Sequence, residues 1–119
     1  MSQGYQIINQ SAIYYLTFQV VDWIDVFSRQ RYRDIILDSY RYSQKEKGLW
    51  LYSYAIMSNH IHLIAASKDG ELSDLVRDIK KFTASKILNT IKTEPESRRE
   101  SMLKRFERCD VSLCGTKQI

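Results

Sequence analysis

The chain has two histidines, His60 and His62, which lie one residue apart in the segment SNHIHLIAAS. The rest of this segment is largely apolar, which is typical of a strand. Because the side chains of a strand alternate between the two faces of a sheet, both imidazoles are expected on one face, with Ile61 and Leu63 on the face that packs against helices. Two neutral imidazoles so placed can bind one divalent cation and leave positions open for a third protein ligand, water or a phosphate oxygen. The alternative is a pair of half-exposed strand histidines without a role.

A surplus of basic residues follows the histidines. Between Val76 and Arg108 there are ten lysines and arginines against five acidic residues, a larger surplus than the +4 of the whole chain. Such a run is either the mixed-charge, solvated face of a helix or a face that binds phosphate groups. On the second interpretation, the DNA-binding candidates are Arg77, Lys80, Lys81 and Lys86.

The first half of the chain shows the elements that would position the histidines. β-branched and aromatic residues predict a strand at Ile13–Val21, and the apolar periodicity of Arg29–Lys47 predicts a helix. Two further strands are expected at Leu49–Ile56 and Ile61–Ala66, separated by turn residues. These two strands should form an antiparallel hairpin.

The second half of the chain predicts two helices. The first is long and amphipathic, with an apolar stripe formed by Leu72, Leu75, Val76, Ile79, Phe82, Ile87 and Ile91. Thr93 and Glu96 match a T-x-x-E capping box with Pro95 in the first turn, so another helix is expected to begin there and to run toward Arg108. The tail, residues 109–119, could supply at most a short strand around residues 111–114.

The order strand, helix, strand, strand, helix predicts the fold class. It is α+β and of the ferredoxin-like, split βαβ type, with helices on one face of an antiparallel sheet. The fourth strand of a complete unit is expected to be missing. The first strand would then keep an open edge, and since open edges invite pairing with another chain, a homodimer is expected.

Length and composition bound the class of protein. With 119 residues, 44% of them hydrophobic, the chain is expected to form a single domain over residues 1–119. No apolar run approaches the roughly 20 residues of a membrane helix, and no signal-peptide pattern starts the chain, so a cytoplasmic protein without a membrane partner is expected. Cys109 and Cys114 lie close together in the sequence and should stay reduced in that compartment. Their C-x4-C spacing leaves open a zinc site shared with the histidines.

The segment YAIMSNHIHLIA, followed by LSDLVRDIKKFTASKIL, resembles the HUH motif (histidine, bulky hydrophobic residue, histidine) of the single-tyrosine transposases. These include small insertion-sequence transposases and REP-associated tyrosine transposases. The resemblance covers about residues 13–108, and residues 109–119 diverge from it. The order of predicted strands and helices agrees with it independently.

The resemblance implies metal-dependent nicking and strand transfer of single-stranded DNA. His60 and His62 would hold Mg2+ or Mn2+ against the scissile phosphate, often beside a DNA hairpin. A tyrosine on a later helix would attack the phosphorus and form a 5′-phosphotyrosine with a free 3′-hydroxyl. The tryptophans Trp23 and Trp50 could stack on bases, although core packing is the more common role of tryptophan.

The chain departs from this family pattern in its tyrosines. All eight precede the histidines, whereas the family's nucleophile follows them, so a truncated copy is expected, without the tyrosine helix. Tyr54 and Tyr52, on the neighbouring strand, are the remaining catalytic candidates, but a side chain fixed in a sheet is poorly placed for in-line attack. Two other functions stay open: a DNA-binding module without chemistry, and a metal-binding dimerisation domain.

Overall fold

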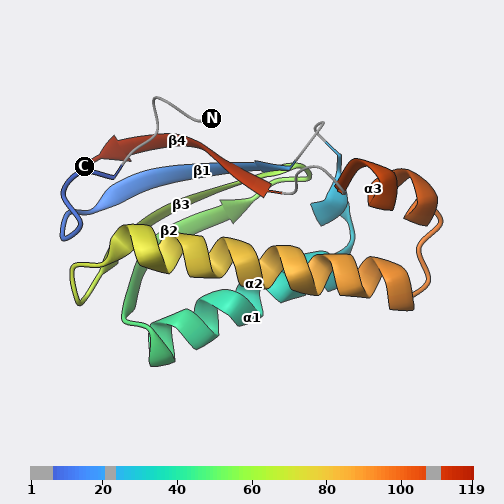
Figure 1. Cartoon of the computed structure of the whole chain (residues 1–119). Coiled ribbons are helices and arrows are strands. Elements are labelled where there is room, and N and C mark those ends of the chain that lie inside the picture. Colours follow the sequence, from blue (N-terminus) through green and yellow to red (C-terminus); the bar gives the residue numbers. More distant parts are fainter. Residues whose placement is uncertain (1–6, 21–23, 107–110) are drawn as a thin grey trace.

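The computed structural model describes residues 7–20, 24–106 and 111–119. Its elements follow one another as β1 (Tyr14–Val20), a short 3-10 helix η2 (Val26–Ser28), α1 (Gln30–Glu46), β2 (Leu49–Ile56), β3 (His60–Ser67), α2 (Leu72–Thr93), α3 (Arg99–Phe106) and β4 (Val111–Gln118). The four strands form one antiparallel sheet in the order β2-β3-β1-β4. Helices α1 and α2 lie side by side against one face of this sheet (Figure 1).

The α+β, ferredoxin-like fold predicted from the sequence is therefore confirmed, with one correction. The fourth strand is present, because β4 pairs with β1 from Val20↔Val111 to Tyr14↔Gln118. With β3 on its other side, β1 is an interior strand, so the expected open edge at the first strand is wrong. The edges of the sheet are β2 and β4.

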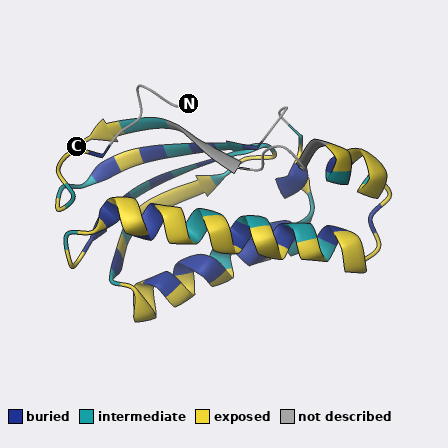
Figure 2. Ribbon diagram, in the orientation of Figure 1, coloured by how far each residue is buried: buried dark blue, intermediate teal, exposed yellow. Residues whose placement is uncertain are grey.

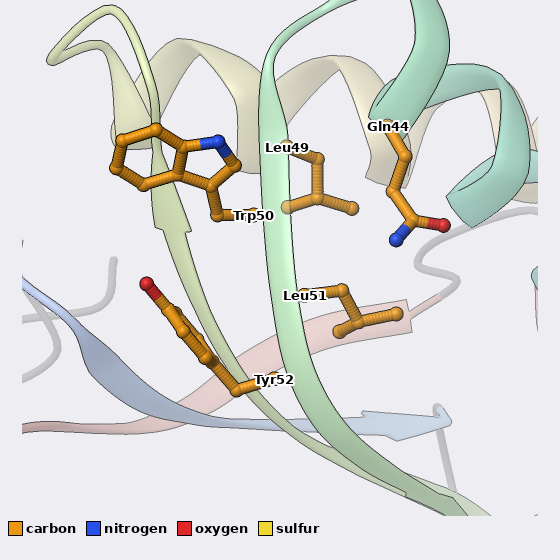
Figure 3. A pocket seen from close by; sticks show the side chains of 5 residues that line it. All are labelled: Gln44, Leu49, Trp50, Leu51 and Tyr52. Atoms are coloured by element: carbon orange, nitrogen blue, oxygen red, sulfur yellow. The ribbon is translucent and has the colours of Figure 1, made fainter.

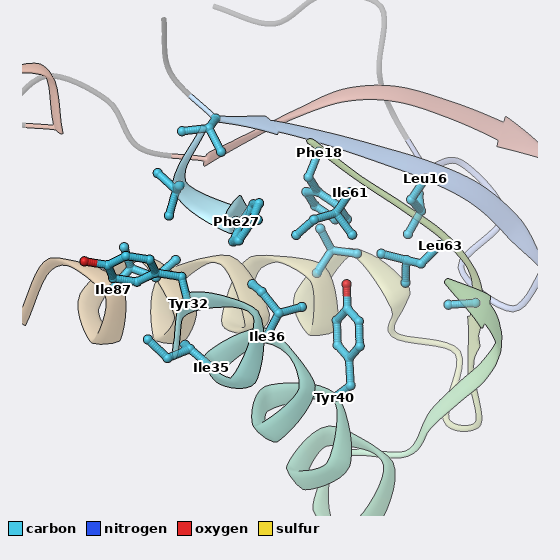
Figure 4. Close-up of a cluster of buried hydrophobic side chains, with 14 of the residues drawn as sticks. Leu16, Phe18, Phe27, Tyr32, Ile35, Ile36, Tyr40, Ile61, Leu63 and Ile87 are labelled. Carbon is cyan, nitrogen blue, oxygen red and sulfur yellow. The ribbon is translucent and has the colours of Figure 1, made fainter. Parts of the chain in front are cut away.

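The hydrophobic core fills the space between the sheet and the two long helices (Figure 4). Alternate residues of β1 and β3 enter it, including Leu16, Phe18, Ile61 and Leu63. The helices contribute residues at helical spacing, including Tyr32, Ile35, Ile36 and Tyr40 from α1 and Leu72, Leu75, Val76, Ile87 and Ile91 from α2. Exposed residues cover the outer sides of both helices (Figure 2). Burial of these apolar side chains stabilises the stacking of helices on the sheet.

Two details of the helices differ from the sequence prediction. Phe82, expected on the apolar stripe of α2, is 49% exposed, and Thr83 is buried in its place with its hydroxyl donating to the carbonyl oxygen of Ile79. The capping box is also wrong, because Thr93 is the last residue of α2 and α3 begins only at Arg99.

No helix in the described part of the chain is long and apolar enough to cross a membrane.

Glu96 instead forms a buried ionic cluster that ties the α2–α3 connection to the start of α1. Its carboxylate accepts hydrogen bonds from Arg98 (Nε, 3.0 Å) and from the Tyr32 hydroxyl (2.9 Å), and Arg29 Nε lies 3.1 Å away. Burial alone would raise the pKa of the Glu96 carboxyl, but the hydrogen bonds from Arg98 and Tyr32 outweigh it and lower the pKa to about 2. Arg98 also pairs with Asp25 at 2.5 Å.

Candidate metal centre on the histidine face

The two histidines lie on the face of the sheet opposite α1 and α2, as the strand alternation predicted. Ile61 and Leu63 are buried against the helices, whereas His60 and His62 are half-buried on the other side of β3. We call this side the histidine face. Register places on it Tyr15, Thr17 and Gln19 of β1, Trp50, Ser53 and Ala55 of β2, His60, His62, Ile64 and Ala66 of β3, and Gly115 and Lys117 of β4.

The two imidazoles are in contact with each other. Their ring centroids are 4.8 Å apart and the rings are nearly perpendicular, at 82°. Burial, and then the proximity of His60, lower the pKa of His62. Both effects favour the neutral imidazole, which is the form that binds metal ions.

The Nδ1 atom of each histidine is held by a neighbouring polar group. His62 Nδ1 forms hydrogen bonds with the Tyr15 hydroxyl (2.9 Å) and the Thr17 hydroxyl (3.1 Å), and the Tyr15 ring stacks on the imidazole at 5.5 Å and 10°. His60 Nδ1 lies 2.8 Å from Asn59 Oδ1. An amide oxygen only accepts, so this contact fits the neutral tautomer of His60 that carries its proton on Nδ1 and a lone pair on Nε2. In proteins, metal-binding histidines are oriented in this way.

The turn between β2 and β3 fixes the position of this site. The N–H of Met57 donates to His60 O (2.8 Å), closing the hairpin. The N–H groups of Val20 and Phe27 donate to the carbonyl oxygens of Asn59 and Ser58, both at 2.9 Å. Asn59, which orients His60, is therefore anchored to β1, and the preceding residue, Ser58, is anchored to η2. Sequence reasoning identified this segment only as a turn.

The residues beside the two histidines offer few further ligands for a metal ion. No group of three His, Cys, Asp or Glu side chains surrounds a common point in the described residues. Gln19 pairs directly with His60 across β1 and β3, so its side chain lies on the histidine face with a Cβ about 5 Å from that of His60. The zinc site that the two cysteines could share with the histidines stays a prediction, because Cys109 and the side chain of Cys114 lie outside the described residues.

The predicted tyrosine candidates are not placed beside the histidines. Tyr54 pairs with Leu63 and packs edge-on against Tyr40 at 6.0 Å, so it lies on the helix side of the sheet, away from the histidines. Tyr52 sits at a register irregularity of β2 and is 57% exposed. Among the described residues, the tyrosine in contact with His62 is Tyr15, which sequence reasoning missed because it depends on strand register.

The predicted DNA-binding cations also lie elsewhere. Arg77, Lys80, Lys81 and Lys86 belong to α2, on the far side of the sheet from the histidines (Figure 1). Arg77 is paired with Asp74 (3.2 Å) and Asp78 (3.5 Å). These residues therefore form a surface separate from the two histidines.

Trp50 is 50% exposed, which corrects the expectation of core packing, and Trp23 lies outside the described residues.

Comparison with known proteins places this geometry in context. Residues 10–106 match the family model described as "Transposase IS200 like". A solved structure of a REP-associated tyrosine transposase bound to a REP hairpin matches 100% of the chain at 14% identity with a TM-score of 0.58, and the chain spans 62% of that protein. A protein of Deinococcus radiodurans R1 classed as a transposase matches 91% of the chain at 14% identity with a TM-score of 0.53, and 96% of that protein is covered. No curated protein matches the chain. The two structures share the fold described above.

Proposed function

We propose that this chain, which belongs to the IS200-like transposase family, acts in transposition by binding single-stranded or hairpin DNA at a divalent metal ion held by His60 and His62. The observation that carries this proposal is the contact of two imidazoles on one sheet face, with each Nδ1 atom held by a polar neighbour. The REP hairpin in the similar solved structure supports DNA as the partner.

The cation that we propose for this site is Mg2+ or Mn2+, held by two nitrogen ligands and one oxygen ligand. The Nε2 atoms of His60 and His62 would be the donors, and the Gln19 amide oxygen, on the same face, is our candidate third ligand. When bound, such a cation polarises a phosphoryl oxygen and stabilises the charge that develops on it. Asn59, Tyr15 and Thr17 keep the two imidazoles in position.

The reaction we propose for the site is nicking and strand transfer through a phosphotyrosine. The tyrosine hydroxyl loses its proton as its oxygen bonds to the phosphorus, and the bond from phosphorus to the 3′ oxygen breaks. The 3′ oxygen takes up one proton to become the 3′-hydroxyl, so the number of protons is unchanged. Tyr15 is engaged with His62, and Tyr54 is on the wrong face. We therefore expect residues 1–119 alone to bind metal and DNA without cutting, unless a partner supplies the tyrosine.

A cleavage and covalent-trapping assay on hairpin DNA with a single-stranded extension tests this function. The wild-type chain should bind the DNA more tightly with Mn2+ than without it, and the His60→Ala/His62→Ala double variant should lose that difference. A covalent DNA adduct of the purified chain that disappears in Tyr52→Phe would show that the chain carries its own nucleophile. Metal-independent binding that is equal in both proteins would favour the second candidate, a DNA-binding module without chemistry.

The α2 cations suggest a second contact with DNA. Because Arg77, Lys80, Lys81 and Lys86 lie on the far side of the sheet, we assign them to the sugar-phosphate backbone of a flanking or hairpin segment. Each lysine or arginine that contacts a phosphate releases counterions, so binding should weaken as salt rises. Charge reversal at Lys80, Lys81 and Lys86 should flatten this salt dependence, and an unchanged slope would remove α2 from the DNA-binding surface.

The edge strand β2 is our candidate for the contact between two copies of the chain. It has neither a proline nor a lysine, which commonly protect sheet edges, and β1, the strand expected to pair, is interior. A homodimer should therefore be seen by light scattering, and Ala55→Pro should convert it to a monomer. A wild-type monomer at high concentration would refute this contact.

A further inference from the structure

Two large aromatic side chains are exposed at the start of β2. Trp50 is 50% exposed and Tyr52 is 57% exposed. Figure 3 shows both pointing to one side of β2, while Leu49 and Leu51 point to the other. Trp50 pairs with Ala66, which belongs to the same alternating set of β3 as His62 and His60. Trp50 therefore shares the histidine face.

The charge of the sheet suits a polyanion. None of the four strands contains an aspartate or a glutamate, although the chain has fourteen acidic residues. Lys117 of β4, opposite Tyr15, is exposed on the histidine face. A nucleic acid strand lying across this face would meet no carboxylate from the sheet itself.

The small side chains beside His62 leave room for a nucleic acid strand to approach the two histidines. Across the sheet, the row through His62 consists of Ala55, Thr17 and Gly115, all of them small. The next row toward the aromatic end carries Ser53, Ile64, Tyr15 and Lys117, and the row after it carries Ala66 and Trp50. Trp50 and Tyr52, which have larger rings, lie at the far end of these rows. Together with Leu49, Leu51 and Gln44 of α1, they line a hollow of about 400 Å³.

We infer that Trp50 and Tyr52 form a stacking platform for unpaired bases of the single-stranded DNA whose phosphate lies at the histidines. This rests on the function proposed above. Trp50 and His62 are separated along β3 by the four steps from Ala66 to His62, which is about 13 Å at the rise of a strand. At a rise of about 3.4 Å per stacked nucleotide, this distance spans roughly four nucleotides, and fewer if the DNA strand is extended.

The platform selects unpaired DNA. In a duplex the faces of the bases are already stacked on one another, whereas a single strand offers them to aromatic side chains. Stacking is tolerant of sequence, because every base has a π face, so the platform would hold the strand without reading it. The substrate is therefore a strand with unpaired nucleotides to one side of the phosphate.

Fluorescence of Trp50 tests the inference in a Trp23→Phe background, where Trp50 is the only tryptophan. Titration with a short oligothymidine in the presence of Mn2+ should quench the emission. Trp50→Ala should weaken binding by roughly 5- to 150-fold, the range expected for loss of one stacked base. Trp50→Phe should retain most of the affinity, because it keeps an aromatic ring. A blunt-ended duplex, which has no unpaired nucleotides, should bind both variants equally.

Tyr42→Ala is the matched control for Tyr52→Ala, since Tyr42 has the same 57% exposure but lies on α1. The inference predicts that Tyr52→Ala lowers affinity for oligothymidine and that Tyr42→Ala does not. Wild-type affinity in both Trp50→Ala and Tyr52→Ala, with Mn2+-dependent binding still lost in the double histidine variant, would overturn the platform and leave the proposed function intact. If the wild-type chain binds no single-stranded DNA, both are overturned.

Discussion

The two hydroxyls that hold His62 offer the sharpest test of the metal centre. Tyr15→Phe removes the hydroxyl that lies 2.9 Å from His62 Nδ1 but keeps the ring that stacks on the imidazole. Thr17→Val removes the second hydroxyl, at 3.1 Å, with almost no change in shape. For Nε2 to bind metal, the neutral ring must carry its proton on Nδ1 and donate it to one of these oxygens. Removal of both leaves that proton without a partner.

The expected loss follows from this geometry. Removing the partners of a metal-binding histidine typically costs about 10- to 100-fold in metal affinity, or about 1.4 to 2.8 kcal/mol. The double variant should show this loss in a Mn2+ titration followed by calorimetry, and each single variant should show less, since one hydroxyl remains. Tyr42→Phe, which removes an exposed hydroxyl on α1, is the control and should bind Mn2+ as the wild type does.

Nitrogen chemical shifts of the His62 ring provide a second measurement that needs no metal. The wild-type ring should be protonated on Nδ1, and the double variant should shift toward the other tautomer. If the double variant binds Mn2+ as tightly as the wild type and keeps its tautomer, the reasoning from Tyr15 and Thr17 is refuted.

Two more predictions follow from other parts of the fold. Because the pKa of Glu96 is lowered from 4.5 to about 2, its ionisation contributes stability that is fully present above about pH 4.5 and is lost as the pH falls toward 2. At 1.36 kcal/mol per pKa unit the contribution is about 3 kcal/mol, so urea unfolding of Glu96→Gln should show a smaller dependence on pH in this window; an unchanged pH dependence would contradict the cluster. Gly115 lies beside Thr17 with room for a Cβ at 3.6 Å, so Gly115→Ala should bind DNA normally, while Gly115→Phe should block the approach to His62; equal DNA affinity of both variants would show that the strand does not cross this row.

The period of two along β3 was enough to predict that both histidines share a face, because β3 pairs with β1 without any shift in register. The same rule failed on β2. An irregularity between Leu51 and Ser53 shifts the alternation, so that Trp50 and Ser53 face the histidines while Tyr54 faces the helices. An extra residue in one strand depends on the pairing of two strands, and a single sequence does not reveal it.

Other errors came from partners that are distant in the sequence. β4 has a weak strand pattern, VSLCGTKQ, and it forms a strand because β1 offers a free row of backbone groups to pair with. The capping-box pattern at Thr93 and Glu96 was present, but α2 continues to Thr93. The buried carboxylate of Glu96 pairs with Arg98, two residues later, and with Arg29 from the start of α1. In both cases a tertiary contact outweighed a local signal.

The absence of acidic residues from the strands bears on the chemistry as well as on the binding of DNA. A carboxylate beside the imidazoles would add a strong metal ligand, but it would also cancel part of the charge of a divalent cation and raise the pKa of the histidines. With two neutral imidazoles and an amide oxygen as ligands, the cation would keep its full charge. Metal affinity from such ligands alone is modest, and the phosphate of the DNA would complete the coordination. A site of this composition would hold its metal most tightly when DNA is bound. Metal and DNA would then be coupled thermodynamically, because each would raise the affinity for the other by the same factor.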